Sequence, residues 1–159
     1  MKSTMLLSLL KIKTTYGNFP ETVKDITTDS RETHEDAVFV AVKGHQTDGL
    51  DYIEDVIKRG CRFIIADRYV ELSSDIGFLV VKDPSKTAAL FAEYIYDFPH
   101  ESQTMIGVTG TNGKTTVSTM IHNLSMALGT KSAYLGTNGF MINETHMVSA
   151  NTTPETTRL

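Results

Sequence analysis

Short apolar runs alternate with amphipathic segments along the first part of the chain. The runs have the length of buried strands, while segment 51–59 places its apolar side chains on one helical face and ends before Gly60. Asp83 followed by Pro84 is typical of a capped helix start. Alternating strands and helices predict an α/β layer architecture. The expected strands are 25–28, 37–42, 62–66 and 77–81.

The region before these elements is less regular. Residues 3–10 predict a short helix. Residues 11–20 predict a connector, because Gly17 and Pro20 break regular structure.

A polar, proline-bearing stretch, 97–104, predicts a boundary between a domain over 1–98 and a second over 99–159. A parallel nucleotide-binding sheet needs several strands covered on both faces, and the second domain offers few. We therefore expect the chain to be the front of a longer protein. The elements expected in the second domain are a strand over 104–108, a glycine loop, a helix over 115–128, a short strand over 133–135 and a hairpin around 143–145.

Composition and charge disfavour several classes of protein. The 159 residues carry a net charge of −4 and no long basic run, which disfavours a general nucleic-acid binder. No apolar run approaches the ~20 residues of a membrane span and no secretory signal is visible, so we expect a cytoplasmic protein. Cys61 is the single cysteine and lies in an apolar stretch, so it is predicted to be a buried structural thiol.

The glycine loop from Gly110 to Thr116, G-T-N-G-K-T-T, carries the strongest chemical signal. Such a loop before a helix presents backbone N–H groups to an anion. Lys114 would reach the terminal phosphates of a nucleotide, and the Thr115 hydroxyl would ligate Mg²⁺. The strict pattern would place a glycine at Val108, so the alternative is a plain glycine turn followed by a helix. The expected order of strand, loop and helix favours a nucleoside triphosphate site.

Three stretches together resemble the Mur ligase family. The loop from Thr109 to Thr116 is similar to the ATP signature of that family, including the missing first glycine. Stretch 28–31 and loop 44–49 are similar to the uridine-binding N-terminal domain of the E-type branch. Stretch 151–154 is similar to the substrate loop of the central domain of that branch. The resemblance covers the whole chain, with the motifs in the right order.

The resemblance implies a small α/β uridine-binding domain followed by the start of a P-loop parallel-sheet ATPase domain. It implies an ATP- and Mg²⁺-dependent ligase of peptidoglycan precursor synthesis that acts as a monomer. ATP would phosphorylate the D-glutamate carboxylate of UDP-N-acetylmuramoyl-L-alanyl-D-glutamate. The amine of an amino acid, L-lysine in preference to meso-diaminopimelate, would then attack the acyl phosphate. The partners would be these small molecules, with no nucleic acid and no membrane span.

The resemblance also implies roles for individual residues. Lys114 would be the catalytic charge and Thr115 the metal ligand, while Leu50 departs from the polar or basic residue that many relatives carry. The expected ATP-binding residues are Thr109, Gly110, Thr111, Asn112, Gly113, Lys114, Thr115 and Thr116. The expected substrate-binding residues are Thr28, Ser30, His45, Gln46, Thr47, Asn151, Thr152 and Thr153.

Two alternatives stay open. The first is an F-type Mur ligase, which adds the dipeptide D-Ala-D-Ala and has the same domain plan. The second is a stand-alone module in which 1–98 binds a UDP-linked ligand without catalysis. The carbamylated lysine, the acidic Mg²⁺ ligand and the amino-acid-binding domain of the family would lie beyond Leu159. We therefore expect that the chain by itself does not catalyse ligation.

Overall fold

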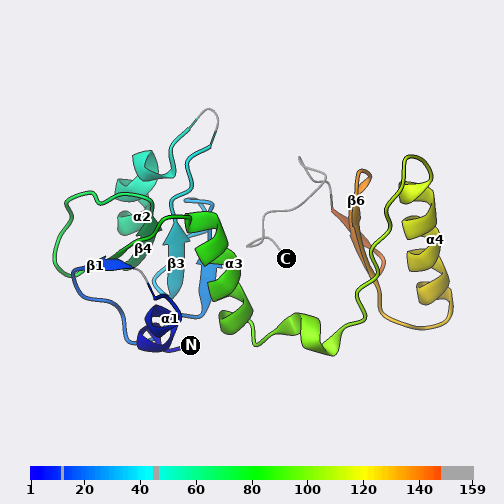
Figure 1. Ribbon diagram of the computed structural model, residues 1–159, viewed down its shortest axis with the longest axis horizontal. Helices are drawn as coiled ribbons and strands as arrows, with labels where there is room; N and C mark the ends of the chain where they lie inside the picture. Colours follow the sequence, from blue (N-terminus) through cyan, green and yellow to red (C-terminus); the bar gives the residue numbers. More distant parts are fainter. Residues whose placement is uncertain (12, 45–46, 148–159) are drawn as a thin grey trace. The chain divides into compact units, whose positions relative to one another are not determined.

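The computed structural model describes residues 1–11, 13–44 and 47–147. The chain divides into two compact units, Met1–Ser102 and Gln103–Leu159. Each unit has a sheet of its own (Figure 1). No helix within the described ranges is long and apolar enough to cross a membrane.

A five-stranded sheet forms the centre of the first unit, in the order β1-β5-β4-β3-β2. Strands β2 to β5 run parallel to one another, and β1 runs antiparallel to β5 at one edge. The predicted α/β architecture is confirmed. The strands are β1 (Thr14–Tyr16), β2 (Asp25–Thr27), β3 (Ala37–Val40), β4 (Phe63–Ala66) and β5 (Gly77–Val80).

The prediction that 11–20 is a connector is wrong in part, because β1 lies within it. All three residues of β1 are exposed, so no buried apolar side chain marks them as a strand. Tyr16 lies opposite Phe78 in the ladder with β5. The segment is therefore a strand because the edge of β5 offers backbone partners, and that neighbour is set by tertiary structure.

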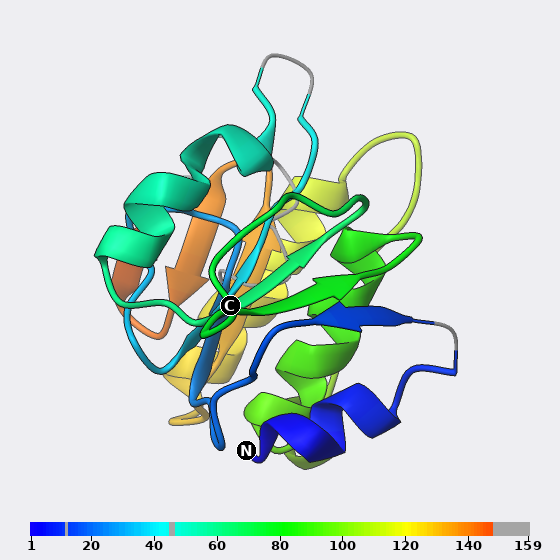
Figure 2. The ribbon, with the colours of Figure 1, turned by 90° about the vertical axis from the view of Figure 1, so that its left-hand side faces the viewer.

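Helices cover both faces of this sheet (Figure 2). On one face, α1 (Ser3–Ser8) and α3 (Pro84–Ile95) pack against the sheet through side chains such as Leu6 and Phe91. On the other face, α2 (Ile53–Lys58) packs through Val56. The 3₁₀ helices η1 (Gly49–Tyr52) and η2 (Pro99–Ser102) lie directly before α2 and shortly after α3.

Successive residues of the central strands alternate between two hydrophobic cores. Val38 and Val40 belong to the core under α1 and α3, whereas Phe39 belongs to the core under α2. Every position of β3 and β4 is buried. Coverage on both faces explains why these strands are continuous apolar runs in the sequence.

Two local details of the first unit confirm sequence predictions. The Asp83 carboxylate accepts a hydrogen bond from the Lys86 backbone N–H at 3.0 Å, and Pro84 opens α3. Cys61 is fully buried, and burial raises the pKa of its thiol. A buried thiol that stays protonated is a structural group.

The second unit packs one helix against a small antiparallel sheet of order β6-β7-β8. Helix α4 (Lys114–Ala127) follows the glycine loop, and its His122 is 3% exposed with Nδ1 3.1 Å from Ser132 Oγ. The hairpin predicted around 143–145 is confirmed by the pairing of β7 with β8. The strands are β6 (Ala133–Gly136), β7 (Gly139–Ile142) and β8 (Thr145–Met147).

The strand predicted over 104–108 is wrong. This segment forms no strand, and Met105 and Ile106 are 73% and 62% exposed. Leu124 and Leu128, at helical spacing, are also exposed. A buried parallel strand needs covered faces and neighbouring strands, and the described strands of this unit pair only with one another. The apolar run therefore has no ladder partner among the described residues.

Candidate nucleotide and substrate sites

The glycine loop leads directly into α4. Gly110 and Gly113 have φ values of 148° and 79°, which L side chains rarely adopt. Gly113 is the N-cap of α4, and no side chain caps the helix start. The first backbone N–H groups of a helix have no partner within the helix, so they remain available to an anion. Thr109, Thr111, Asn112 and Thr116 are exposed around this helix start.

The Lys114 ammonium bonds to its own loop. Its Nζ donates hydrogen bonds to the carbonyl oxygens of Gly110 at 2.5 Å and Thr111 at 3.2 Å. These contacts hold the positive charge over the loop. A phosphate oxygen accepts a stronger, charge-assisted hydrogen bond than a neutral carbonyl, so a bound nucleotide would compete for this ammonium.

The Thr115 hydroxyl lies beside a residue that the sequence analysis did not single out. Thr115 is half-buried, and its Oγ1 is 2.9 Å from Oγ1 of Thr137, in the turn between β6 and β7. One turn later, Ser118 Oγ instead donates back to the Lys114 carbonyl oxygen at 2.7 Å. Thr115 therefore presents its hydroxyl outside its own helix.

These residues fit the phosphates and the Mg²⁺ of a nucleotide. An open helix start, positive-φ glycines and a lysine over the loop are the elements of a phosphate cradle. Within the described part of the chain, no group of three or more His, Cys, Asp or Glu could hold a metal ion. Mg²⁺ is commonly held by few protein ligands together with phosphate oxygens and water, so the Thr115 hydroxyl suits this cation.

The predicted substrate residues of the first unit lie at the carboxyl edge of its parallel strands. Thr28 and Ser30 come directly after β2, and Thr47 lies in the loop after the neighbouring strand β3. Carboxyl ends of parallel strands meet at one edge of a sheet, where ligands of α/β proteins commonly bind. Their topology therefore brings these three residues to one edge.

Hydrogen bonds hold the turn after β2 in shape. The Asp29 backbone N–H donates to Thr27 Oγ1 at 3.0 Å, and Arg31 donates to both Asp29 carboxylate oxygens at 2.9 and 2.6 Å. Thr33 Oγ1 donates to the Ser30 carbonyl oxygen at 2.7 Å. A turn held in this way can present its side chains to a ligand at small entropic cost.

An ion pair that sequence reasoning missed joins the loop after β3 to the segment after β4. Arg68 Nη2 is 2.5 Å from Asp48 Oδ2, while Asp48 Oδ1 accepts the Leu50 backbone N–H at 3.0 Å. The hydrogen bond from Arg68 lowers the pKa of Asp48. A basic residue two positions after the end of the buried strand β4 was the available signal. Arg68 thus lies at the same sheet edge as Thr47.

Five predicted substrate residues lie outside the described residues. They are His45, Gln46, Asn151, Thr152 and Thr153. Their assigned roles stay predictions.

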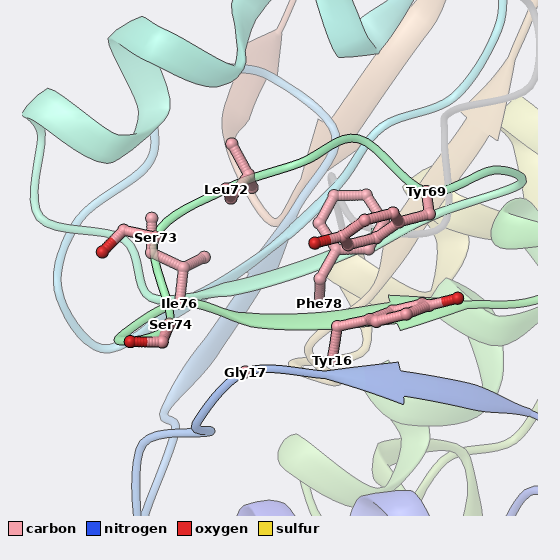
Figure 3. Close-up of a pocket in the computed structure, with 8 residues that line it drawn as sticks. All are labelled: Tyr16, Gly17, Tyr69, Leu72, Ser73, Ser74, Ile76 and Phe78. Atoms are coloured by element: carbon pink, nitrogen blue, oxygen red, sulfur yellow. The ribbon is translucent and has the colours of Figure 1, made fainter.

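A small cavity lies toward the other end of the sheet (Figure 3). It has a volume of about 180 Å³ and lies beside Tyr16 and Tyr69, whose rings stack with centroids 3.9 Å apart. Its lining includes Ser73 and Ser74 but no charged side chain. The cavity is lined by residues around the start of β5, away from the turn after β2, so it does not belong to the predicted substrate edge.

Two family models match the chain: "Mur ligase family, catalytic domain" over residues 22–95 and "Mur ligase middle domain" over residues 108–159. The chain belongs to the Mur ligase family. Among curated Mur ligases, the UDP-N-acetylmuramoyl-L-alanyl-D-glutamate--L-lysine ligases of Staphylococcus epidermidis and Staphylococcus aureus are 43% and 41% identical over 159 residues. The matches cover 100% of this chain, and the chain spans 32% of the length of these relatives.

Solved Mur ligases share the fold. The MurF ligase of Thermotoga maritima in complex with ADP is 34% identical with a TM-score of 0.55, covering 69% of this chain and 24% of that one. MurF of Acinetobacter baumannii is 26% identical with a TM-score of 0.61, covering 82% of this chain and 28% of that one. These matches agree with the α/β class expected from the sequence.

Proposed function

We propose that this chain supplies the UDP-substrate domain and the opening part of the ATP-binding domain of a Mur ligase that adds L-lysine to UDP-N-acetylmuramoyl-L-alanyl-D-glutamate. The observation that carries the proposal is the match of all 159 residues, at 43% identity, to a staphylococcal ligase named for that substrate and amino acid. Domain limits of 1–98 and 99–159, a monomeric state and a cytoplasmic location are parts of the same proposal.

The glycine loop supports ATP as the phosphoryl donor. The carboxylate of D-glutamate is a poor acyl donor because its oxygen is a poor leaving group. Transfer of the terminal phosphoryl group from ATP to this carboxylate forms an acyl phosphate and ADP. Attack by the lysine amine on the acyl carbon then forms the amide, releases phosphate and loses a proton to solvent.

Residues of the glycine loop would stabilise the charge of the ATP phosphates and hold the phosphates in position. The Lys114 ammonium would leave its loop carbonyls and bind the terminal phosphates, which steadies the charge that moves during transfer. The backbone N–H groups at the start of α4 would orient the phosphates. Mg²⁺, held partly by Thr115, would neutralise phosphate charge. The solved complex of a MurF relative with ADP supports adenine nucleotide binding by this chain.

The edge formed by Thr28, Ser30 and Thr47 would bind the uridine part of the substrate. The support is their common position at the carboxyl ends of β2 and β3, together with the hydrogen bonds that hold the turn after β2. Asn151, Thr152 and Thr153 would bind the sugar-peptide part.

A chimera tests the ligase assignment. This chain would replace the matching first part of the S. epidermidis ligase, and amide formation would be followed by ADP release and mass spectrometry. We expect ligation of L-lysine that depends on ATP. Binding of UDP-N-acetylmuramoyl-L-alanyl-D-glutamate to the chain alone, measured by calorimetry, checks the substrate edge independently. An inactive chimera together with absent substrate binding would refute the proposal.

The F-type reaction is the second candidate, and the likeness to two MurF structures supports it. The identity to these proteins, 34% and 26%, is lower than the 43% to the L-lysine ligase. Calorimetry separates the substrates directly. Tighter binding of the UDP-linked tripeptide than of the UDP-linked dipeptide would favour the F-type assignment. Binding of UDP-linked ligands with no response of the loop to ATP would favour a stand-alone binding module.

A further inference from the structure

The hydroxyl of Thr115 and that of Thr137 form a hydrogen-bonded pair with 2.9 Å between their oxygens. Thr137 lies in the β6–β7 turn, which the pairing of Gly136 with Gly139 closes. Figure 1 shows β6 beside α4 within the second unit. A residue 22 positions away in the sequence therefore reaches the start of the helix that follows the glycine loop.

Two contacts with β8 hold the turn that carries Thr137. His146 Nε2, in β8, donates to the Asn138 carbonyl oxygen at 2.9 Å. Gly139 has a φ of 94°, and a Cβ there would lie 2.7 Å from the Met147 carbonyl oxygen. The turn is therefore tied to β8, so the position of the Thr137 hydroxyl is set by the sheet and not by the glycine loop.

A hydroxyl that ligates a metal uses an oxygen lone pair and keeps its proton. The metal makes that proton a better donor, and the proton needs an acceptor that leaves the lone pair facing the metal. Thr137 Oγ1, at 2.9 Å, can accept the hydrogen bond that the Thr115 hydroxyl donates. The alternative acceptor for a helical threonine is a carbonyl oxygen of its own helix, the arrangement that Ser118 adopts.

We propose that Thr137 is a positioning residue for the magnesium ligand of the glycine loop. It accepts the hydrogen bond of the Thr115 hydroxyl and directs the oxygen lone pair toward the cation that accompanies the nucleotide phosphates. This inference rests on the proposed function, because it requires Mg²⁺ and ATP at the glycine loop. It adds a residue from the β6–β7 turn that the family motif does not contain.

The test compares Thr137→Val, which keeps the shape and removes the hydroxyl, with Thr137→Ser, which keeps the hydroxyl. Thr145→Val makes the same chemical change at an exposed position of β8 and serves as the control. Amide shifts of Gly113, Lys114 and Thr115 in isotope-labelled chain report ATP binding up to millimolar concentrations. Each variant is titrated with ATP in EDTA, and then with Mg²⁺ at fixed ATP.

We expect Thr137→Val to bind ATP in EDTA as the unchanged chain does and to lose about tenfold in apparent Mg²⁺ affinity, the size typical of groups that orient a metal ligand. Thr137→Ser and Thr145→Val should keep the original Mg²⁺ response. An equal loss in EDTA and in Mg²⁺ would show that the turn only supports the loop, and an unchanged Thr137→Val would also overturn the inference. Absence of any ATP-induced shift in the unchanged chain would overturn the nucleotide site itself and this inference with it.

Discussion

The Tyr96 hydroxyl, at the end of α3, donates a hydrogen bond to the Asp25 carboxylate at the start of β2. The same carboxylate accepts the Ile26 backbone N–H at 2.7 Å and lies 3.2 Å from His34 Nε2. Helix α3 is thereby joined to the edge of the sheet just before Asp97, whose φ of 58° marks the end of the helix. This contact spans 71 residues of sequence.

The Tyr96–Asp25 contact should make stability depend on pH. Burial raises the pKa of Asp25, but hydrogen bonds from Tyr96, His34 and the Ile26 amide outweigh it and leave that pKa below its ordinary value. Burial and the bond to Asp25 raise the pKa of Tyr96 to about 12. The Asp25 contribution is therefore present above the ordinary carboxylate pKa and lost as acid protonates the folded state. The Tyr96 contribution is present below pH ~10 and lost as the pH rises toward the folded value.

We expect Tyr96→Phe to lower the free energy of unfolding by about 1 kcal/mol near neutral pH. Urea denaturation across pH measures the loss, which should shrink in acid and above pH ~10. Tyr94→Phe, on the same helix, is the control because Tyr94 packs on Phe98 through its ring, which the substitution keeps. Equal losses for the two variants, or a loss independent of pH, would contradict the role of the contact.

Gly113→Ala should weaken both the loop and nucleotide binding. A Cβ at this position meets no atom within 4 Å, so the cost arises from the φ of 79° and not from a clash. That conformation costs an alanine about 1 kcal/mol, and relaxing it would turn the first N–H groups of α4 away from the phosphates. Gly107→Ala, which also meets no atom within 4 Å and lacks a positive φ, should leave thermal stability and ATP-induced amide shifts unchanged.

Lys114→Ala should abolish ligation in the chimera while calorimetry shows unchanged binding of the UDP-linked substrate. The lysine supplies the only charge that the described glycine loop, 109–116, places beside the phosphates. Its loss should cost at least about tenfold in ATP affinity, which corresponds to ~1.4 kcal/mol. Lys131→Ala removes an exposed lysine beyond α4 and controls for net charge. Retained ligation by Lys114→Ala would refute the assigned role.

Arg68→Gln should weaken substrate binding by roughly three- to tenfold while changing the free energy of unfolding by less than ~1 kcal/mol, because the ion pair with Asp48 is half-exposed. The expected cause is a looser loop between β3 and η1. Calorimetry with UDP-N-acetylmuramoyl-L-alanyl-D-glutamate measures the change. Arg59→Gln, at the end of α2, removes the same charge from another part of the unit. If Arg68→Gln and Arg59→Gln bind the UDP-linked substrate with equal affinity, Arg68 does not contribute to the substrate edge.

Much of the fold could be predicted because its signals are local. The buried strands β3 and β4 are continuous apolar runs, and Asp83 with Pro84 marks the start of α3. Strand β1 and segment 104–108 were mispredicted for opposite reasons. The exposed residues of β1 form a strand because β5 offers a free edge, whereas the apolar residues of 104–108 have no neighbouring strand in the described structure.

The candidate sites also combine features that local sequence determines with contacts that depend on the tertiary structure. The spacing of Gly110, Gly113 and Lys114 is a property of the sequence, since positive φ and a helix start are set within a few residues. Contacts between residues of distant segments could not be predicted from local sequence patterns. Tertiary structure alone decided that Arg68 would meet Asp48 and that Thr137 would reach Thr115. Local periodicity and turn chemistry act over a few residues, whereas these contacts depend on how strands pair and where their connecting turns come to lie.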